Sequence, residues 1–346
     1  MDKSSPVLVS GGTGYVASWI IHDLLKAGYH VRTSVRDKSN ITKYQHLLNI
    51  EAETEGTLEV FEADLLQRNA FIKPVDGCEV VFHTASPFKV GSVKNAYRDL
   101  VEPALKGTEN VLNAALQEAS VRRVVLTSSV VSVFGDAIEI NDTPQHKFTE
   151  ENWNRTNTES YQPYNYSKTI AEKKAWEIAK LQEQWQLVVI NPGFVMGPSL
   201  TARKDSTSID FMINLTGGKF KTGVPDFYYG VVDVRDVAQA HIKAAFNPET
   251  SGRHLLVNET ISILDFAAII RSEFPELPLP KRLVPKHLFY LLGPLMGFSW
   301  KYIKNNWGIK YAFDNSYSKS DLGIKYRKIK DTLTDHVNQL KRDHLI

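Results

Sequence analysis

The sequence predicts an α/β fold, in which helices cover both faces of a doubly wound parallel sheet and a smaller C-terminal lobe follows. Three observations predict it. Strand-like and helix-like segments alternate over residues 1–193. A glycine-rich turn joins the first strand to the first helix. After Gly193 the alternation stops, which indicates a second structural unit.

Each segment of the alternation has its own signal. Short apolar runs rich in β-branched residues predict strands at residues 6–10, 29–35, 58–63, 79–83, 123–127 and 187–191. Apolar residues at helical spacing predict helices at residues 15–27, 105–120 and 165–183. The helical segments are long enough to serve as the crossover connections that parallel strands of one sheet require, and such crossovers are right-handed. We therefore expect these strands to form one parallel sheet.

The chain beyond Gly193 is organised differently. Residues 197–225 form a polar excursion, residues 231–234 predict a further strand, and residues 275–285, with four prolines, predict a stiff connector. We therefore expect a dinucleotide-binding domain and a substrate-binding lobe. The domain takes residues 1–193 with about 226–254, and the lobe about 194–225 and 255–346.

Three helices of the C-terminal part have recognisable signals. Asp236 with Gln239, and Ser262 with Asp265, have the spacing of helix-capping boxes. Residues 330–344 have the apolar periodicity of an amphipathic helix. We expect helices to begin at both capping boxes.

Composition excludes several classes of protein. The 346 residues are 42% hydrophobic and 23% charged, which is ordinary for a globular chain. The net charge is +2 and the basic residues are scattered, so no nucleic-acid partner is expected. Cys78 is the only cysteine, so no internal disulfide can form and a cytoplasmic location is expected. The ten histidines lack ligand spacing, so no metal site is expected.

No segment predicts a membrane span. Residues 1–6 are short and polar, unlike a signal peptide. The most apolar later stretch, residues 288–300, has 13 residues and contains Pro294, so it is too short to cross a bilayer. We expect it to form a buried helix pair or a pocket wall; a contact with one membrane leaflet is the alternative.

The glycine-rich turn predicts a dinucleotide site of the Rossmann type. Gly11 permits the tight turn, Gly14 lets a pyrophosphate approach the backbone, and small Ala17 lets the helix pack on the sheet. The free N–H groups at the helix N-terminus favour an anion. Besides these glycines, we expect cofactor contacts from Thr13, Tyr15 and Val16.

The end of the second strand predicts which nicotinamide cofactor is used. Arg36 suits the 2′-phosphate of NADPH, and Lys38 and Lys43 follow it. Asp37 is the opposing signal, since a carboxylate at this place would bind the 2′-hydroxyl of NADH. The basic residues favour NADPH.

Three residues predict carbonyl chemistry. Tyr164 and Lys168 lie four apart and share one helix face. An ammonium group lowers the pKa of a nearby tyrosine, which makes Tyr164 a usable general acid. Ser129 ends the fifth strand, at the sheet edge where ligands bind, and can hold the same oxygen. Ser128 is the alternative serine, whereas Tyr161 and Tyr166 have no lysine at the fourth position.

These motifs together resemble the extended short-chain dehydrogenases/reductases, in the group of dihydroflavonol reductases, cinnamoyl-CoA reductases and methylglyoxal reductases. The resemblance covers nearly the whole chain. The matching stretches are residues 11–17, 35–37, 63–65, 81–87, 122–129, 164–176, 191–193, 197–198, 232–238 and 320–323.

The resemblance implies roles for individual residues. Ser129, Tyr164 and Lys168 match the family's catalytic triad, and Arg36 and Lys43 match residues that hold the 2′-phosphate. Further positions match cofactor contacts along the sheet edge, at the adenine or at the nicotinamide: Asp64, Leu65, Thr84, Ala85, Ser86, Thr127, Pro192, Gly193 and Val195. The activity implied is hydride transfer from NADPH to a carbonyl carbon.

Departures from the family pattern bear on the substrate. Phe134 stands where plant dihydroflavonol reductases carry Asn, and the segment around Tyr164 lacks the Trp/Cys motif of cinnamoyl-CoA reductases. Neither plant substrate is therefore indicated. We expect an aromatic pocket for an apolar or aromatic aldehyde or ketone, lined by Phe88, Phe134, Tyr161, Phe194 and Tyr228.

Other functions are compatible with the same fold. A nucleotide-sugar epimerase or dehydratase needs basic residues for a diphosphate, and dehydratases carry an acidic pair where Ser128 and Ser129 stand. A 3β-hydroxysteroid-type dehydrogenase is favoured by the apolar residues 288–300. A non-enzymatic NADP(H) sensor is disfavoured, since such proteins lose the Tyr or Lys. Neither length nor charge decides between a monomer and a homodimer.

Overall fold

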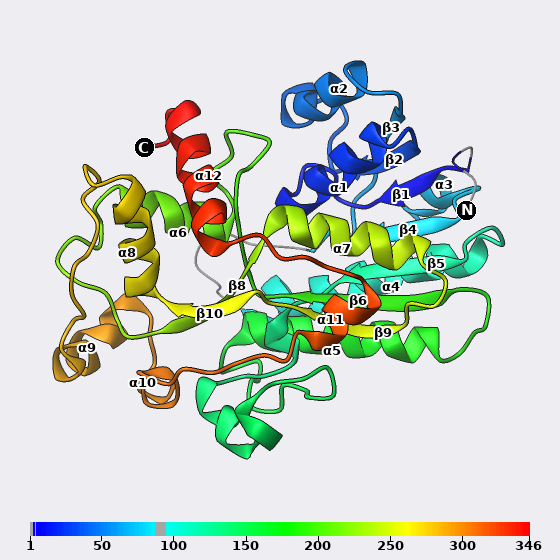
Figure 1. Ribbon diagram of the computed structural model, residues 1–346. Coiled ribbons are helices and arrows are strands. Elements are labelled where there is room, and N and C mark those ends of the chain that lie inside the picture. The colour runs from blue at the N-terminus through cyan, green and yellow to red at the C-terminus, as the bar shows by residue number, and fades with distance from the viewer. Residues whose placement is uncertain (1–2, 4, 87–94) are drawn as a thin grey trace.

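The chain forms a seven-stranded sheet in which every neighbouring pair of strands is parallel (Figure 1). A computed structural model describes residue 3, residues 5–86 and residues 95–346. The strand order is β3-β2-β1-β4-β5-β6-β9. These strands are β1 Val7–Val9, β2 His30–Val35, β3 Thr57–Glu62, β4 Val80–His83, β5 Arg123–Thr127, β6 Gln186–Pro192 and β9 Gly252–Leu256.

Helices cover both faces of this sheet, with α7 on one side and α5 on the other (Figure 1). One layer consists of α1 Tyr15–Lys26, α2 Gln45–Ala52 and α7 Val234–Phe246. The other consists of α3 Ile72–Val75, α4 Glu102–Gln117 and α5 Pro163–Ala179. Val7 and Val9 face the first layer while Leu8 between them faces the second, so the strands are apolar throughout.

The predicted fold class is confirmed, and the six predicted strands lie within about a residue of their expected limits. The seventh strand, β9, was not predicted. Its sequence, GRHLL, contains two charged or polar residues that would be exposed on an ordinary surface strand. Arg253 and His254 are buried, because each has a carboxylate partner, Glu172 and Asp321 respectively.

A second, three-stranded sheet lies beyond β6, in the order β10-β8-β7. It consists of β7 Phe194–Met196, β8 Tyr228–Asp233 and β10 Glu259–Ser262. Its apolar core includes residues from α6 Thr207–Thr216, α8 Ile263–Glu273, α9 Lys286–Leu292, α10 Trp300–Asn306 and α12 Ile329–Arg342. The helix α6 lies in the excursion of residues 197–225, where no helix was predicted.

The remaining elements are short and connect the larger ones. They are η1 Ile41–Lys43, η2 Tyr97–Val101, η3 Val130–Ser132, η4 Ala137–Asp142, η5 Pro144–His146, η6 Gly293–Met296 and α11 Ser316–Asp321. Within the described part of the chain, no helix is both long and apolar enough to cross a membrane.

One predicted helix start is wrong. The helix α7 begins at Val234, two residues before Asp236, because β8 runs directly into it and Asp233 caps it by accepting a hydrogen bond from the Arg235 N–H at 2.8 Å. Asp236 lies in the first turn, and its carboxylate accepts from the Arg327 backbone N–H at 2.8 Å. The other capping box is confirmed, since Ser262 and Asp265 bond reciprocally at the start of α8.

The expectation of a buried helix pair at residues 288–300 is also wrong in part. The segment folds into α9, η6 and the start of α10, and only some of its side chains face the core. Phe289 is buried, whereas Leu291 and Leu295 are 73% and 85% exposed.

Candidate active site

A cavity of about 950 Å³ runs along the carboxyl ends of the central strands. It passes the point where the strand order reverses between β1 and β4, which is where ligands bind in doubly wound sheets. Residues that follow β1, β2, β3, β4, β5 and β6 all contribute to its wall. The start of α5, the loop before α6, the small sheet and α10 also contribute to the wall. Its size fits a dinucleotide or drug-sized ligand.

The glycine-rich turn forms one end of this cavity. Gly11 has a φ of +68°, and a Cβ there would lie 2.9 Å from the Cβ of Ala85, so only glycine fits. Gly14 caps α1, and its N–H donates to the Gly11 carbonyl at 2.8 Å. A phosphate group can therefore come close to the backbone of this turn. Thr13, Tyr15 and Val16 line the same wall, as predicted.

Arg36 and Asp37, adjacent after β2, have different surroundings. Arg36 lines the cavity. The Asp37 carboxylate accepts hydrogen bonds from the Ser39 hydroxyl at 2.6 Å and its backbone N–H at 2.9 Å, and these bonds lower the pKa of Asp37. Asp37 and Lys43 are not among the described lining residues. Lys43 nevertheless lies close enough for its charge to help lower the pKa of Asp205, which does line the cavity.

The segments after β3 and β4 also contribute to the cavity wall. Asp64, Leu65 and Leu66 line it, and the Asp64 carboxylate accepts from the Leu66 N–H at 2.8 Å. Thr84, Ala85 and Ser86 also line it, with the Thr84 hydroxyl bonded to the Ser10 carbonyl.

His83 is structural. Its ring bonds the Ser10 hydroxyl at 3.0 Å and ties β4 to β1. Burial, with the charge of Lys168, lowers the pKa of His83 to about 3, so it is neutral at physiological pH.

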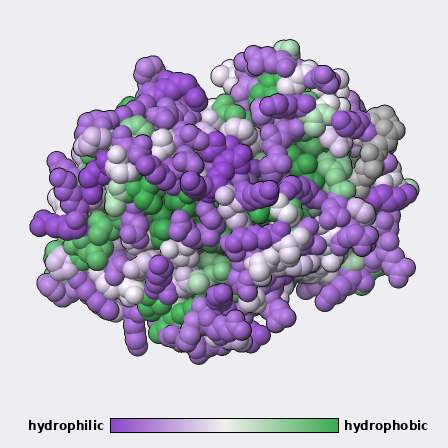
Figure 2. Space-filling view, in the orientation of Figure 1, coloured by the Kyte–Doolittle hydropathy of each residue, from purple (hydrophilic) through white to green (hydrophobic). Residues whose placement is uncertain are grey.

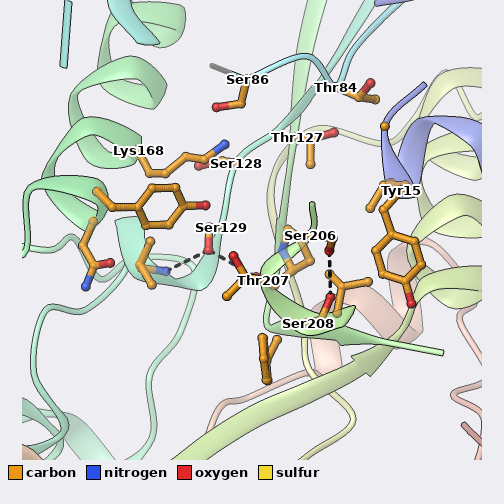
Figure 3. Close-up of a pocket in the computed structure, with 18 of the residues that line it drawn as sticks. Tyr15, Thr84, Ser86, Thr127, Ser128, Ser129, Lys168, Ser206, Thr207 and Ser208 are labelled. Carbon is orange, nitrogen blue, oxygen red and sulfur yellow. Dashed lines mark hydrogen bonds between the residues drawn. The ribbon is translucent and has the colours of Figure 1, made fainter. Parts of the chain in front are cut away.

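Ser129, Tyr164 and Lys168 line one stretch of the cavity. Ser129 follows β5 and caps η3, while the other two lie on the first turns of α5. Figure 3 shows Lys168 and Ser129 extending toward the same open space, with Thr207 and Ser208 nearby. The fold thus brings Ser129 to the same cavity wall as Tyr164 and Lys168, which lie 35 and 39 positions later in the sequence.

The titration of this group differs from the sequence expectation. Tyr164 is 37% exposed in the cavity wall, yet desolvation by the surrounding protein raises its pKa to about 12, although a neighbouring ammonium was expected to lower it. Burial lowers the pKa of Lys168 to about 8, and the charge of Glu172 opposes that change. Desolvation is thus the largest cause of both shifts, since it disfavours the charged form of each group. Tyr164 therefore keeps its proton at neutral pH.

A buried polar network supports these residues from beneath. Glu172 is 1% exposed and lies one turn after Lys168 on α5. Its carboxylate accepts from the hydroxyls of Ser128 and Ser132 at 2.5 Å each, from Asn191 Nδ2 at 2.8 Å and from Arg253 Nε at 2.6 Å. These four hydrogen bonds compensate the buried Glu172 carboxylate for its lost hydration, so its ion pair with Arg253 can be accommodated in the interior. No local motif marks Glu172, because its partners come from three distant segments: the turn after β5, β6 and β9.

The other end of the cavity is aromatic. Phe134, Phe194 and Tyr228, which sequence analysis proposed for a substrate pocket, line it. Five further lining residues were not predicted: Phe227 and Tyr229 on either side of Tyr228, and Tyr302, Asn306 and Tyr311 from the C-terminal part of the chain. Phe134 stacks on Phe148 with ring centres 4.6 Å apart and packs against Tyr311 at 4.9 Å.

Two predicted pocket residues are placed elsewhere. Tyr161 is not among the described lining residues, and its hydroxyl donates to the buried Asp136 carboxylate at 2.8 Å. That carboxylate also accepts from Asn305 and Asn306 of α10, at 2.8 and 2.9 Å. Tyr161 thus holds η4 against α10. Phe88 lies outside the described residues.

The loop before α6 also reaches the cavity. Arg203 donates from Nη1 to the Thr13 carbonyl at 2.6 Å, and pairs with Asp205 at 2.8 Å. Ser206, Thr207 and Ser208 follow at the start of α6 and line the wall (Figure 3). The remaining predicted cofactor contacts, Thr127, Pro192, Gly193 and Val195, line the cavity as well.

The chain belongs to the NAD dependent epimerase/dehydratase family, whose model matches residues 7–258. Within it, named relatives are reductases, so the predictions of an oxidoreductase and of the extended short-chain dehydrogenase/reductase type are confirmed.

Two curated plant relatives cover nearly the whole chain. Cinnamoyl-CoA reductase 1 of Petunia hybrida is 36% identical over 98% of this chain and 93% of its own length. An anthocyanidin reductase of Vitis vinifera is 33% identical, over 94% and 96%.

A solved relative supports the fold and the class of cofactor. The yeast methylglyoxal/isovaleraldehyde reductase Gre2, complexed with NADPH, is 31% identical with a TM-score of 0.80, over 99% of this chain and all of that chain. Vestitone reductase from alfalfa is 25% identical with a TM-score of 0.74.

Proposed function

We propose that this protein is an NADPH-dependent carbonyl reductase that converts a neutral, apolar or aromatic aldehyde or ketone to an alcohol. One observation carries the proposal: a single cavity contains the glycine-rich turn, the Ser129, Tyr164 and Lys168 group, and an aromatic end. A cofactor on the turn and a substrate in the aromatic end would meet beside Tyr164.

The cavity fits the cofactor end to end. The backbone at Gly11 and Gly14 would hold the pyrophosphate, and Arg36 the 2′-phosphate. Leu65 and Leu66 would flank the adenine, and the residues from Pro192 to Val195 the nicotinamide. The bound cofactor supplies the hydride. The NADPH complex of the yeast relative supports this choice over NADH.

The chain's own residues would handle the proton. Tyr164 holds its proton at neutral pH and would donate it to the carbonyl oxygen as negative charge develops there. Lys168, a cation below its pKa of about 8, would stabilise the resulting phenolate. Ser129 would donate a hydrogen bond to the same oxygen, since Ser128 is already committed to Glu172.

The walls of the aromatic end support a neutral substrate. Among the described lining residues, those contributed by residues 130–137, 227–230 and 302–311 include no charged side chain. A charged group placed there would lose its hydration without a partner. The same lack of Lys and Arg disfavours the nucleotide-sugar alternative, whose diphosphate needs cations. The presence of Tyr164 and Lys168 in the cavity disfavours a sensor without activity.

Steady-state assays test the proposal. NADPH oxidation is followed with a panel of aliphatic and aromatic aldehydes and ketones, with NADH in parallel. We expect Tyr164→Phe to lower kcat by about 10²–10⁴-fold, the range of general acid catalysis, while NADPH affinity changes little. Tyr166→Phe is the matched control, since Tyr166 lies on the same helix outside the described cavity wall. Near-full activity of Tyr164→Phe, or tight NADPH binding without turnover of any carbonyl, would contradict the proposal.

A further inference from the structure

A cluster of large apolar side chains lies exposed at the end of the molecule formed by α9 and α10. It consists of Leu288, Leu291, Leu292, Leu295, Met296 and Trp300, which we call the α9–α10 patch. These are six of the fifteen exposed large hydrophobic residues in the described chain, yet they come from 13 consecutive positions. Figure 2 shows hydrophobic surface at the end where α9 lies in Figure 1. Such clustering marks a binding surface.

The exposure follows from how these short elements pack. Phe289 and Ile303 face the core, where the ring centres of Phe289 and Phe227 lie 5.7 Å apart. Gly293 brings η6 close to α10, because a Cβ there would lie 2.8 Å from Ile303 Cδ1. With one face fixed inward, the opposite faces point to solvent. Those outer faces carry Leu, Met and Trp where an ordinary surface helix carries polar residues.

Charge is segregated along the same stretch. Residues 277–313 contain none of the chain's 39 Asp and Glu but six of its 41 Lys and Arg, so the remainder of the chain is net negative. The six are Lys281, Arg282, Lys286, Lys301, Lys304 and Lys310. Two acidic groups of other segments lie near: Asp226, within electrostatic reach of Lys286, and the buried Asp136, which bonds Asn305 and Asn306 of α10. An apolar centre with basic surroundings complements a surface that is apolar and anionic.

We propose that the α9–α10 patch docks the protein on the surface of an anionic lipid bilayer. The Leu, Met and Trp side chains would enter the boundary between headgroups and acyl chains, while the lysine stems lie along it with their ammonium groups at the phosphates. A second copy of the chain fits less well. A two-fold interface on this patch would gather the lysines of α9 and α10 from both copies around one apolar centre, where like charges repel.

Docking would place the aromatic end of the cavity close to the bilayer. Tyr302 and Asn306 lie on α10, the helix that begins with Trp300, and both line the cavity. An apolar carbonyl dissolved in the bilayer would then enter by a short path. This consequence rests on the proposed function, whereas lipid binding itself does not.

Co-sedimentation of the full chain with vesicles tests the proposal without any substrate. The vesicles are pure phosphatidylcholine, or phosphatidylcholine with about 30% phosphatidylserine, at ~100 mM and ~1 M salt. We expect binding to the anionic vesicles only, weakened at high salt. Leu295→Glu should lower the partition coefficient by about tenfold or more, and Lys304→Glu by about fivefold. Leu181→Glu is the matched control, because Leu181 is 86% exposed just after α5, outside the patch.

Each outcome decides the proposal. Thermal melting and NADPH-dependent turnover of a water-soluble aldehyde show whether each variant is folded and active, so a failure of catalysis is distinguished from a failure of lipid binding. Equal sedimentation with and without vesicles would overturn the proposal. So would a dimer in light scattering that Leu295→Glu converts to a monomer, since a second copy would then cover the patch.

Discussion

Two neighbouring serines after β5 have different roles in the structure. The Ser128 hydroxyl is buried and donates to Glu172 at 2.5 Å. The Ser129 hydroxyl lies at the cavity, with a long 3.5 Å contact to the Pro192 carbonyl, so a ligand oxygen can compete for it. Side chains alternate at a strand end, which is why only one of two adjacent serines can face a substrate.

Glu172 gives a prediction at the scale of one residue. Its negative charge raises the pKa of Lys168, so Glu172→Gln should lower that pKa further. Lys168 would lose its charge at lower pH, and the alkaline limb of the kcat profile should move to lower pH. Steady-state rates between about pH 6 and 10 with a non-titrating substrate check this, because that range spans the lowered pKa of Lys168, about 8.

If Glu172 had a purely structural role, Glu172→Gln would lower kcat at every pH and leave the alkaline limb of the profile in place. Glu177→Gln on the same helix is the control, since Glu177 is largely exposed and pairs with Lys174. An unshifted limb in Glu172→Gln would show that Glu172 does not tune Lys168.

At the scale of elements, helix caps fix where α8 and α7 begin. The Ser262 hydroxyl accepts from the Asp265 N–H at 3.1 Å, and Asp265 bonds back to the Ser262 N–H at 2.9 Å. Asp233 caps α7 by accepting from the Arg235 N–H, and its carboxylate also accepts from the Thr332 hydroxyl of α12 at 2.8 Å. A cap that reaches a second helix orients both.

The capping box of α8 gives a stability prediction. Ser262→Ala should lower the free energy of unfolding by about 1 kcal/mol, because helix N–H groups lose a partner. Ser272→Ala, near the end of the same helix, should change it little, since that hydroxyl bonds the Ile269 carbonyl, which the helix does not need. Urea denaturation followed by circular dichroism measures both. Equal midpoints for the two variants would contradict the role of the cap.

At the scale of the whole molecule, buried histidines make the free energy of unfolding depend on pH. Burial lowers the pKa of His83 and of His336 to about 3, and that of His241 to about 4. These side chains tie separate parts together, as His241 bonds Thr127 of β5 at 2.7 Å and His336 accepts from the Gly197 N–H at 3.2 Å. All three therefore stay neutral in the folded state across the physiological range.

Acid should destabilise the protein through these groups. Below an ordinary histidine pKa of about 6.5 the unfolded chain binds protons that the folded chain does not, so stability is full above that pH and falls as pH decreases toward 4. The loss should be on the order of 1 kcal/mol per buried histidine at about pH 5.5. Urea midpoints from about pH 7.5 to 5.5 check this. His336→Gln should reduce the slope and the exposed His146→Gln should not; a flat wild-type profile would refute the linkage.

The local signals of this chain carried much of the architecture. The apolar runs predicted six of the seven sheet strands, and the glycine-rich turn has the positive φ at Gly11 that its sequence predicts. Tyr164 and Lys168 could be paired from their spacing alone. The sequence-based predictions were wrong or incomplete where distant segments set a residue's environment, as with Arg253 in β9. They were also wrong where a strand runs directly into a helix, as at Asp233.

The sequence by itself determined the class of fold, the position of the dinucleotide turn and the catalytic candidates, because backbone geometry and residue spacing are local. The tertiary structure decided the rest. It placed Arg36 in the cavity wall, bonded the Ser128 hydroxyl to Glu172 beside the cavity-lining Ser129, and completed the aromatic end with Tyr302 and Tyr311. It also left Leu295 and its neighbours in solvent. Burial, hydrogen-bond partners and pKa depend on which segments meet, and only the folded chain defines that.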